Sequence, residues 1–417
     1  MNRRDLLHRS AAAALFGLAP SLEAARALPD TSLLDKDAEA YWKRIRDEQF
    51  LLPDWRAFLN NGSLGVAPRP VLDAVTDYLN RGAGLLMTEY PRWGYETLDE
   101  ERTELSAYLG CRKDELAITH NATEGLSMIA AGLDLKSGDE VVMTDHEHPS
   151  GKAGWQRRAQ RDGITIREVP IPHPPKSSEQ LTEVMISALG PKTKVLFFSG
   201  ILSPTGVIMP VRQICDAARA KGVICVVDGA HMNGQIPLNL SEFHCDYYAG
   251  SPHKWMFAPA GCGILYIREE NLDRLWPTIV TGGWDDKSLK AARFMKVGTN
   301  SRAIIVGMMA GLRFMKSIGP DRIYDRIHSL AKTNYAMAKS RPWLEIISSE
   351  DDRLYGSLVT ISFRGANTKP LWELASKRKI WIYGSDRLRI STHIHTRPQD
   401  LEAFYATVDE ALGHKAA

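Results

Sequence analysis

Two short segments of this sequence place a lysine and a carboxylic acid where both could serve one reaction. Residues 226–231, VVDGAH, end an apolar stretch in Asp228, and residues 245–254, CDYYAGSPHK, bring Lys254 after a second apolar stretch. A lysine amine can bond covalently to an aldehyde, and an acid beside a pyridine nitrogen keeps that nitrogen protonated so that the ring accepts electrons. This order predicts a pyridoxal 5'-phosphate site, with Lys254 as the attachment residue and Asp228 as the partner of the ring nitrogen.

A phosphate group requires hydrogen-bond donors, and several residues could supply them. Ala122 and Thr123 follow an expected strand and open an expected helix, where free backbone amides and a hydroxyl can hold a phosphate. Ordinary helix capping would explain these two residues equally well. Ser251 and His253 stand beside the lysine, and Thr299 lies in a Gly-Thr-Asn turn. We expect all of them to contact the phosphate.

Two histidines could contact the ring of the cofactor. His148 follows an expected strand and could stack on the pyridine ring, while His231 could reach its phenolic oxygen. The segment Asp-His-Glu-His that ends at His148 could instead suggest a metal site. It lacks the spacing of a zinc-binding helix and a third ligand is not evident, so no metal is predicted. His146, in the same segment, also fits a surface loop.

The chemistry of Lys254 requires a lowered pKa, because only the neutral amine attacks an aldehyde. The apolar residues 255–257 around it fit that requirement, although a lysine lying along an apolar surface would look the same. Arg389, on a short expected strand, is predicted to bind a substrate carboxylate in a bidentate pair. Asn61, from a Gly/Pro/Asn-rich loop at residues 58–70, is a second predicted substrate contact. Asp386 and Arg387 are expected to form a solvated surface pair.

The alternation of short β-rich stretches with helical stretches predicts an α/β fold with a mostly parallel sheet flanked by helices. Ligands in such sheets bind beyond the carboxyl ends of the strands, where the candidate residues fall. A smaller α+β domain is expected to follow at residues 301–417, after a large cofactor-binding domain at residues 58–300. Residues 28–57 are expected to pack on the smaller domain. The expected strands of the large domain are residues 115–119, 140–144, 164–169, 194–199, 223–228, 247–250 and 263–267.

The N-terminus has the features of a twin-arginine export signal. Arg3 and Arg4 precede a short apolar segment, and a small-x-small site ends at Ala27. The alternative is a basic N-terminal helix of a cytoplasmic protein. We expect residues 1–27 to engage the twin-arginine machinery and the mature protein to be periplasmic.

Charge and cysteine content narrow the range of partners. Residues 1–27 hold four of the 52 basic residues and two of the 50 acidic ones, so residues 28–417 carry equal numbers of each. This balance gives no reason to expect nucleic acid or an anionic membrane as partner. No stretch after the N-terminus is apolar enough to span a membrane. The five cysteines lack zinc-ligand or CxxC spacing, and the sequence does not require a disulfide.

The ordered set of residues resembles fold-type I pyridoxal-phosphate enzymes of the class V aminotransferase group, and within it the isopenicillin-N-epimerase-like branch. The resemblance extends from about Phe58 to the C-terminus. It implies the roles given above for Lys254, Asp228 and Arg389, and it adds Ser203, which stands where desulfurases carry an asparagine. It also implies a homodimer in which the neighbouring subunit supplies Thr299.

The sequence does not choose among transamination, epimerisation and elimination. Residues 377–388 contain no cysteine, so the sulfur transfer of cysteine desulfurases is less expected, but a desulfurase or β-lyase remains the alternative enzyme. A protein that binds the cofactor without turnover is the non-enzyme alternative. The leading expectation is a periplasmic enzyme for an amino-acid or peptide-like amine, for example one that tailors an exported metabolite such as a siderophore.

Overall fold

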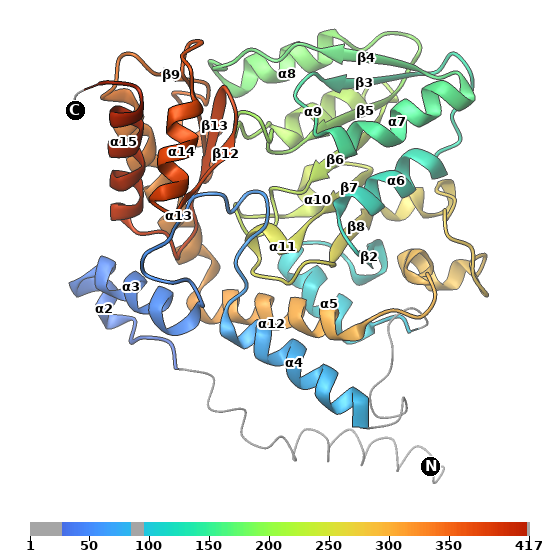
Figure 1. Cartoon of the computed structure of the whole chain (residues 1–417). Helices are drawn as coiled ribbons and strands as arrows, with labels where there is room; N and C mark the ends of the chain where they lie inside the picture. The colour runs from blue at the N-terminus through green and yellow to red at the C-terminus, as the bar shows by residue number, and fades with distance from the viewer. Residues whose placement is uncertain (1–26, 85–95, 415–417) are drawn as a thin grey trace.

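The computed structural model describes residues 27–84 and 96–414, which fold into a larger and a smaller unit that meet along a seam (Figure 1). The predicted export signal lies outside the described residues except for Ala27. The larger unit surrounds the main sheet, and the smaller one, in orange and red at the left of Figure 1, contains the C-terminal helices.

A seven-stranded sheet forms the centre of the larger unit, in the order β2-β8-β7-β6-β5-β3-β4. Strand β8 runs antiparallel to both of its neighbours, and the other pairings are parallel. The expected mostly parallel α/β sheet is therefore confirmed. Its strands begin and end within one residue of the predicted bounds. They are β2 (Leu116–Thr119), β3 (Glu140–Thr144), β4 (Thr165–Val169), β5 (Thr193–Ser199), β6 (Ile224–Gly229), β7 (Tyr247–Gly250) and β8 (Gly263–Ile267).

Helices connect these strands and begin close to their carboxyl ends. Polar side chains start two of them: Asn121 caps the helix after β2, and His148 caps the helix after β3. This arrangement directs helix N-termini, with their free amides, at the same edge of the sheet. The helices of the larger unit are α4 (Arg69–Gly84), α5 (Asp99–Leu109), α6 (Ala122–Gly132), α7 (Pro149–Asp162), α8 (Ser178–Ser187), α9 (Val211–Arg219), α10 (Leu240–Phe243) and α11 (Pro252–Trp255), with 3-10 turns η1 (Lys113–Glu115), η2 (Glu269–Arg274) and η3 (Lys287–Met295).

The smaller unit is built on a four-stranded antiparallel sheet in the order β12-β13-β10-β9. Its own core includes Leu371, Leu388 and Phe404. The bounds are α13 (Pro320–Lys339), β9 (Glu345–Ile346), η4 (Asp352–Leu354), β10 (Leu358–Ser362), α14 (Lys369–Lys377), β12 (Tyr383–Gly384), β13 (Arg387–Ser391) and α15 (Pro398–Ala411). A separate short parallel pair joins β1 (Ala57–Phe58) to β11 (Ile380–Trp381).

Helix α12 (Arg302–Ile318) belongs to the larger unit rather than to the smaller one. Its buried side chains, among them Met308 and Leu312, lie in the core that contains the seven-stranded sheet, and the helix packs along α4 (Figure 1). The expected boundary at residue 301 is therefore too early, because the change in sequence texture there marks a change from strands to helices and not a change of core.

The N-terminal segment lies across the seam instead of packing on the smaller unit alone. Its helices are α2 (Ser32–Lys36) and α3 (Ala38–Gln49). After them, Phe50 packs against Phe257 and Phe314 of the larger unit and against His395 of the smaller one. Arg46 donates a hydrogen bond to the His395 carbonyl at 2.7 Å. This segment thus ties the two units together.

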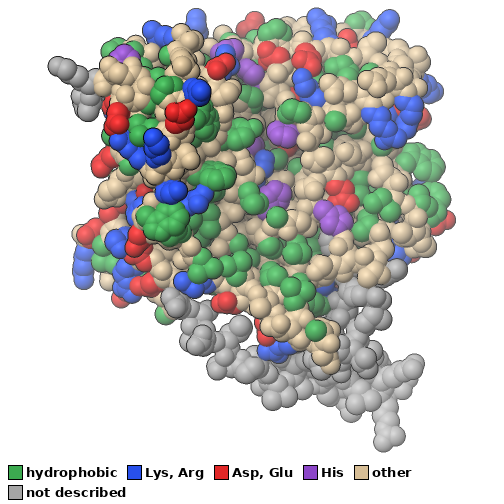
Figure 2. All heavy atoms as spheres, in the orientation of Figure 1, with side chains coloured by type: hydrophobic (Ala, Val, Ile, Leu, Met, Phe, Trp, Pro, Cys, Tyr) green, Lys and Arg blue, Asp and Glu red, His purple; other side chains and the backbone are tan. Residues whose placement is uncertain are grey.

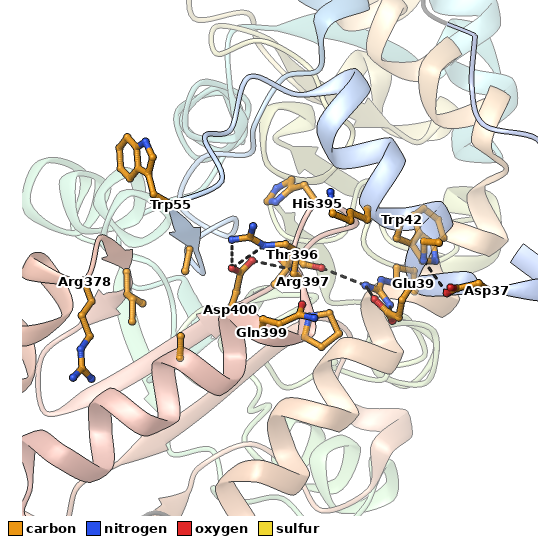
Figure 3. Close-up of a pocket in the computed structure, with 17 residues that line it drawn as sticks. Asp37, Glu39, Trp42, Trp55, Arg378, His395, Thr396, Arg397, Gln399 and Asp400 are labelled. Atoms are coloured by element: carbon orange, nitrogen blue, oxygen red, sulfur yellow. Dashed lines mark hydrogen bonds and ion pairs between the residues drawn. The ribbon is translucent and has the colours of Figure 1, made fainter. Parts of the chain in front are cut away.

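A cavity of about 750 Å³ opens beside this segment, and most of its charged side chains are paired, either with one another or with residues just outside the cavity (Figure 3). Arg326 donates to Glu39 at 2.9 Å, and Arg397 donates to Asp400 at 2.7 Å. Groups that neutralise one another leave little charge for a ligand, so this cavity is not the candidate site.

None of the helices in the described residues is long and apolar enough by itself to cross a membrane. Helices α12 and α13 meet such a criterion only as a pair bent by 83°.

A buried ion pair in the smaller unit provides a stability prediction. Arg341 donates two hydrogen bonds to Asp409, at 2.8 and 2.7 Å, and both side chains are less than a tenth exposed. Asp409→Ala would leave the guanidinium buried without its partner, which should lower the free energy of unfolding by about 3 kcal/mol. Glu410→Ala, which removes an exposed partner of Arg378, should cost less than about 1 kcal/mol. Urea unfolding followed by circular dichroism measures both, and equal losses would contradict the prediction.

Candidate active site

A cavity of about 210 Å³ lies at the carboxyl edge of the main sheet, where the ends of β5, β6 and β7 meet the starts of α6 and α7. Figure 2 shows histidine side chains gathered in the middle of this face of the molecule, between the smaller unit and the main sheet. All the predicted cofactor contacts except Thr299 line the cavity: Ala122, Thr123, His148, Ser203, Asp228, His231, Ser251, His253 and Lys254.

The Lys254 amine is buried and hydrogen-bonded in a way that favours its neutral form. Its Nζ lies 3.2 Å from Nε2 of His231, whose Nδ1 accepts a hydrogen bond from the indole of Trp255 at 3.4 Å. With Nδ1 as acceptor, the proton of the neutral imidazole is on Nε2, which donates to the amine. Burial lowers the pKa of Lys254 to about 8 and keeps the pKa of His231 well below its usual range. The amine is therefore suited to act as a nucleophile or a base.

The backbone around Lys254 is fixed from outside the main sheet. Asn61 donates from its side-chain amide to the Lys254 carbonyl at 2.7 Å, and the Gly65 amide donates to the His253 carbonyl at 2.9 Å. A Cβ atom on Gly65 would lie 2.2 Å from the Lys254 carbonyl oxygen, so the loop approaches too closely for any other residue. Asn61 is fully buried and lines neither this cavity nor a second cavity, of about 680 Å³, beside it, so it positions Lys254 and is not placed for the predicted substrate contact.

Asp228 lies at the carboxyl end of strand β6 and has one carboxylate oxygen available to a ligand. Its Oδ1 accepts the Ala230 amide at 2.8 Å, whereas Oδ2 accepts no hydrogen bond within the described residues. Burial raises its pKa, while Lys254 and His148 oppose this rise. A Cβ atom on Gly151 would approach Oδ2 to 3.3 Å, so the glycine keeps this side of the carboxylate open. A pyridinium N–H fits the free oxygen, because it would supply the missing donor and a compensating charge.

The start of α6 offers a phosphate site next to Lys254. Asn121 caps the helix by accepting the Glu124 amide at 2.8 Å, and the Ala122 amide donates to Ser251 Oγ at 3.1 Å. The Thr123 and Ser251 hydroxyls, the helix amides and the helix dipole then converge on one end of the cavity. The donor set fits a phosphate, and the whole cavity fits pyridoxal phosphate.

Thr299 is exposed and does not line the cavity of its own chain. The turn that carries it does lie near the start of α6, because Asn300 contacts His120 there. The predicted contact of Thr299 with a phosphate across a dimer interface stays a prediction.

His148 lies where two cavities meet. Its Nδ1 accepts the Ser150 amide at 3.2 Å, which fixes the ring at the start of α7. Burial and the nearby Lys254 lower its pKa, so the ring is neutral and can stack on a cofactor.

The adjoining cavity, of about 680 Å³, contains Arg389 and shares His148 and Ser203 with the first. Arg389 donates to Ser203 Oγ at 2.6 Å and to Ser63 Oγ at 3.1 Å, and its guanidinium lies 4.5 Å from the Tyr383 ring centre. It is 5% exposed, and among the described residues no carboxylate lies within ion-pairing distance. Burial lowers its pKa to about 10. A substrate carboxylate would compensate this buried charge.

Ser203 therefore contacts Arg389, in addition to lining the predicted cofactor cavity. Ser63, Ser150, Gly151 and Ser199 also line that cavity, although the sequence did not mark them as site residues. For Ser199, its position at the carboxyl end of a predicted strand was a signal that could have identified it as a site residue.

A buried carboxyl group behind the site was also missed. Glu147 accepts hydrogen bonds from Ser199 Oγ and Thr144 Oγ1, both at 2.6 Å, and burial raises its pKa to about 7. It links the ends of β3 and β5. In the sequence it stands between His146 and His148.

All five cysteines lie within the described residues, each is unpaired, and none lines either cavity. Burial raises the pKa of the Cys111 thiol to about 12 and that of the Cys262 thiol still further. None of these thiols is placed to attack a substrate.

Comparison with known proteins decides the family. The class V aminotransferase profile matches residues 58–387. The chain belongs to this family. An isopenicillin N epimerase of Amycolatopsis lactamdurans is 31% identical over 395 residues, which cover 88% of this chain and 98% of that protein. A probable cysteine desulfurase of Pyrococcus abyssi is 26% identical and covers 66% of this chain and 71% of its own length.

Solved structures have the same fold. The apo cysteine desulfurase of Thermococcus onnurineus NA1 superposes with a TM-score of 0.77 at 23% identity, over 88% of this chain and 97% of that one. A C-DES variant with glycine covalently linked to its pyridoxal phosphate gives 0.76 at 24% identity, over 91% and 99%. The protein is thus a fold-type I enzyme of the pyridoxal-phosphate class, and the cofactor, when bound, acts as an electron sink for a substrate carbon next to nitrogen.

The pKa of Lys254 leads to a pH prediction. Because only the neutral amine attacks an aldehyde, the rate at which cofactor-free protein takes up pyridoxal phosphate should rise between pH 7 and 9, with a midpoint near 8. An exposed lysine, whose ordinary pKa is 10.5, would give a midpoint near that value instead. Stopped-flow absorbance across this range measures the rate, with Lys254→Ala as the blank, and a rate that still rises above pH 9.5 would contradict the prediction.

Proposed function

We propose that this protein is an exported pyridoxal-phosphate enzyme that acts on the amino group of an amino-acid or peptide-like substrate, by transamination or epimerisation. The observation that carries the proposal is the buried, uncompensated guanidinium of Arg389 in a cavity that adjoins the Lys254 amine. A carboxylate bound there would place the neighbouring amino carbon toward Lys254.

The residues around Lys254 support proton transfer at that carbon. A neutral Nζ can accept a proton, and the adjacent His231 Nε2–H fixes the direction of its lone pair. His148 lies across the cavity, where it can cover the other side of the bound ring. With the cofactor bound, Lys254 could deliver the proton either toward the cofactor, which would lead to transamination, or to the opposite face of the substrate carbon, which would lead to epimerisation.

The size of the second cavity and the relatives favour a substrate larger than a simple amino acid. A space of about 680 Å³ is in the range of pockets for drug-sized ligands. The relative with 31% identity is named an isopenicillin N epimerase. Together with the predicted export signal, this supports tailoring of an exported metabolite, such as a siderophore, in the periplasm. The homodimer is a part of the proposal that rests on the family resemblance alone.

Cysteine desulfurase or β-lyase activity is the second candidate, since several relatives and fold neighbours carry those names. The positions of the five cysteines disfavour the desulfurase route, because that route needs a thiol at the substrate. Addition of cysteine should therefore leave no persulfide on the protein.

The test is spectroscopic and uses the mature protein with a matched Lys254→Ala variant. We expect the wild-type protein to show a visible band of bound cofactor, and borohydride to fix the cofactor on the peptide that contains Lys254. Amines that bleach this band toward the aminated cofactor would show half-transamination. Exchange of the α-hydrogen for deuterium without bleaching, together with formation of the opposite stereoisomer, would show epimerisation. Absence of a band after addition of pyridoxal phosphate would contradict the proposal.

The export proposal has a separate test. Arg3→Lys together with Arg4→Lys should retain the protein in the cytoplasm, because the paired arginines are the recognised feature. Cell fractionation and the mass of the mature N-terminus measure the outcome, with Arg9→Lys as control. Unchanged periplasmic accumulation of the double variant would contradict twin-arginine export.

A further inference from the structure

The second cavity contains two arginines from one strand. Arg387 and Arg389 lie two residues apart on β13, so their side chains are on the same face of the sheet, and both line the cavity of about 680 Å³. Their Cα atoms are about 7 Å apart, because a strand rises about 3.4 Å per residue. Arg389 is buried toward Ser203, while Arg387 is exposed at the outer end of the strand.

Arg387 is oriented by the imidazole of His173. Its Nη2 lies 3.4 Å from Nε2 of His173, and Nδ1 of this histidine lies 3.2 Å from the Ile171 carbonyl oxygen. A carbonyl can only accept, so Nδ1 carries the proton and Nε2 is left to accept from Arg387. The contact restrains the guanidinium without neutralising it. The surface pair expected between Asp386 and Arg387 does not form, and no carboxylate in the described residues lies within ion-pairing distance of Arg387.

The residues that line the cavity supply no free carboxylate to neutralise the two arginines. Glu147 is its one acidic residue among those described, and hydrogen bonds from Ser199 and Thr144 already occupy that carboxyl group. The remaining walls include Trp372, Ile382 and Tyr383, which are suited to hold an apolar chain. The cavity therefore combines two positively charged side chains with an apolar wall.

We propose that Arg387 is a specificity residue that binds a second, distal carboxylate of the substrate, so that the enzyme prefers an amino-acid unit with two carboxylates. This inference rests on the proposed function. Arg389 takes the carboxylate next to the amino carbon, and Arg387 takes one at the end of a short chain. One carboxylate cannot engage both guanidinium groups face to face, because Arg389 is turned inward by Ser203 and Ser63. Because both arginines come from one strand and line one cavity, the two carboxylates would belong to a single substrate and be joined by a short carbon chain.

The experiment measures the concentration at which each of two matched amines half-saturates the change in the visible band of the holoenzyme. 2-Aminoadipate carries a second carboxylate, and 2-aminoheptanoate replaces that carboxylate by an apolar end of similar length. Both stereoisomers of each are titrated, and the half-saturating concentrations are compared. We expect the half-saturating concentration of 2-aminoadipate to be at least ten-fold lower than that of 2-aminoheptanoate. This preference should weaken at high salt.

The variants separate Arg387 from the rest of the site. Arg387→Gln should abolish most of the ten-fold preference and change the value for 2-aminoheptanoate by less than two-fold. Arg387→Lys should retain part of the preference. Arg364→Gln, an exposed arginine just after β10 that lines neither cavity, is the matched control and should change nothing. Titration calorimetry of adipate into the cofactor-free protein gives a second readout, in which only Arg387→Gln and variants of Arg389 should weaken binding.

The outcomes also distinguish this inference from the function on which it rests. Equal half-saturation by the two amines, or a preference that survives in Arg387→Gln, would overturn the role of Arg387 and leave the proposed function intact. A band that responds to no amine would overturn the proposed function, and the inference with it.

Discussion

The site depends on keeping one lysine amine buried while disfavouring its charged form. Taking an ammonium out of water has a large desolvation cost, and this burial, with the neutral imidazole of His231 beside the amine, lowers the pKa of Lys254 to about 8. The same burial requires a fixed backbone, since a flexible segment would admit water. Asn61 and Gly65 hold the lysine segment from one side, and His393 donates to the Trp255 carbonyl at 3.2 Å from the other.

These contacts make the two units parts of one site. The larger unit supplies the groups that suit a cofactor, because the parallel strands end at one edge with helix N-termini beside them. The smaller unit supplies the cations that suit a substrate, on strand β13. The groups that suit the cofactor therefore lie on the main sheet, whereas the groups that we propose to select the substrate lie on the smaller sheet.

The sequence predicted the main sheet and most of the cofactor cavity because both depend on local patterns. Apolar stretches that end in Thr144, Ser199 or Asp228 mark strands and their carboxyl ends directly. The roles of Asn61 and Arg387 could not be predicted in this way. Asn61 meets Lys254 only after distant parts of the chain pack together, and Arg387 differs from a surface arginine only through the cavity it faces. Helix α12 was assigned to the wrong core for the same reason, since an amphipathic pattern does not say which core it covers.

The three buried histidines at the seam have a consequence for the protein as a whole. His231, His393 and His395 are neutral in the fold, and burial lowers the pKa of each, to about 4 for His393. The unfolded chain would bind protons at these rings below about pH 6.5, whereas the folded chain resists them. Folding stability is therefore lost as the pH falls from about 6.5 toward 4. Mild acid would therefore weaken the contacts that these rings make between the two units.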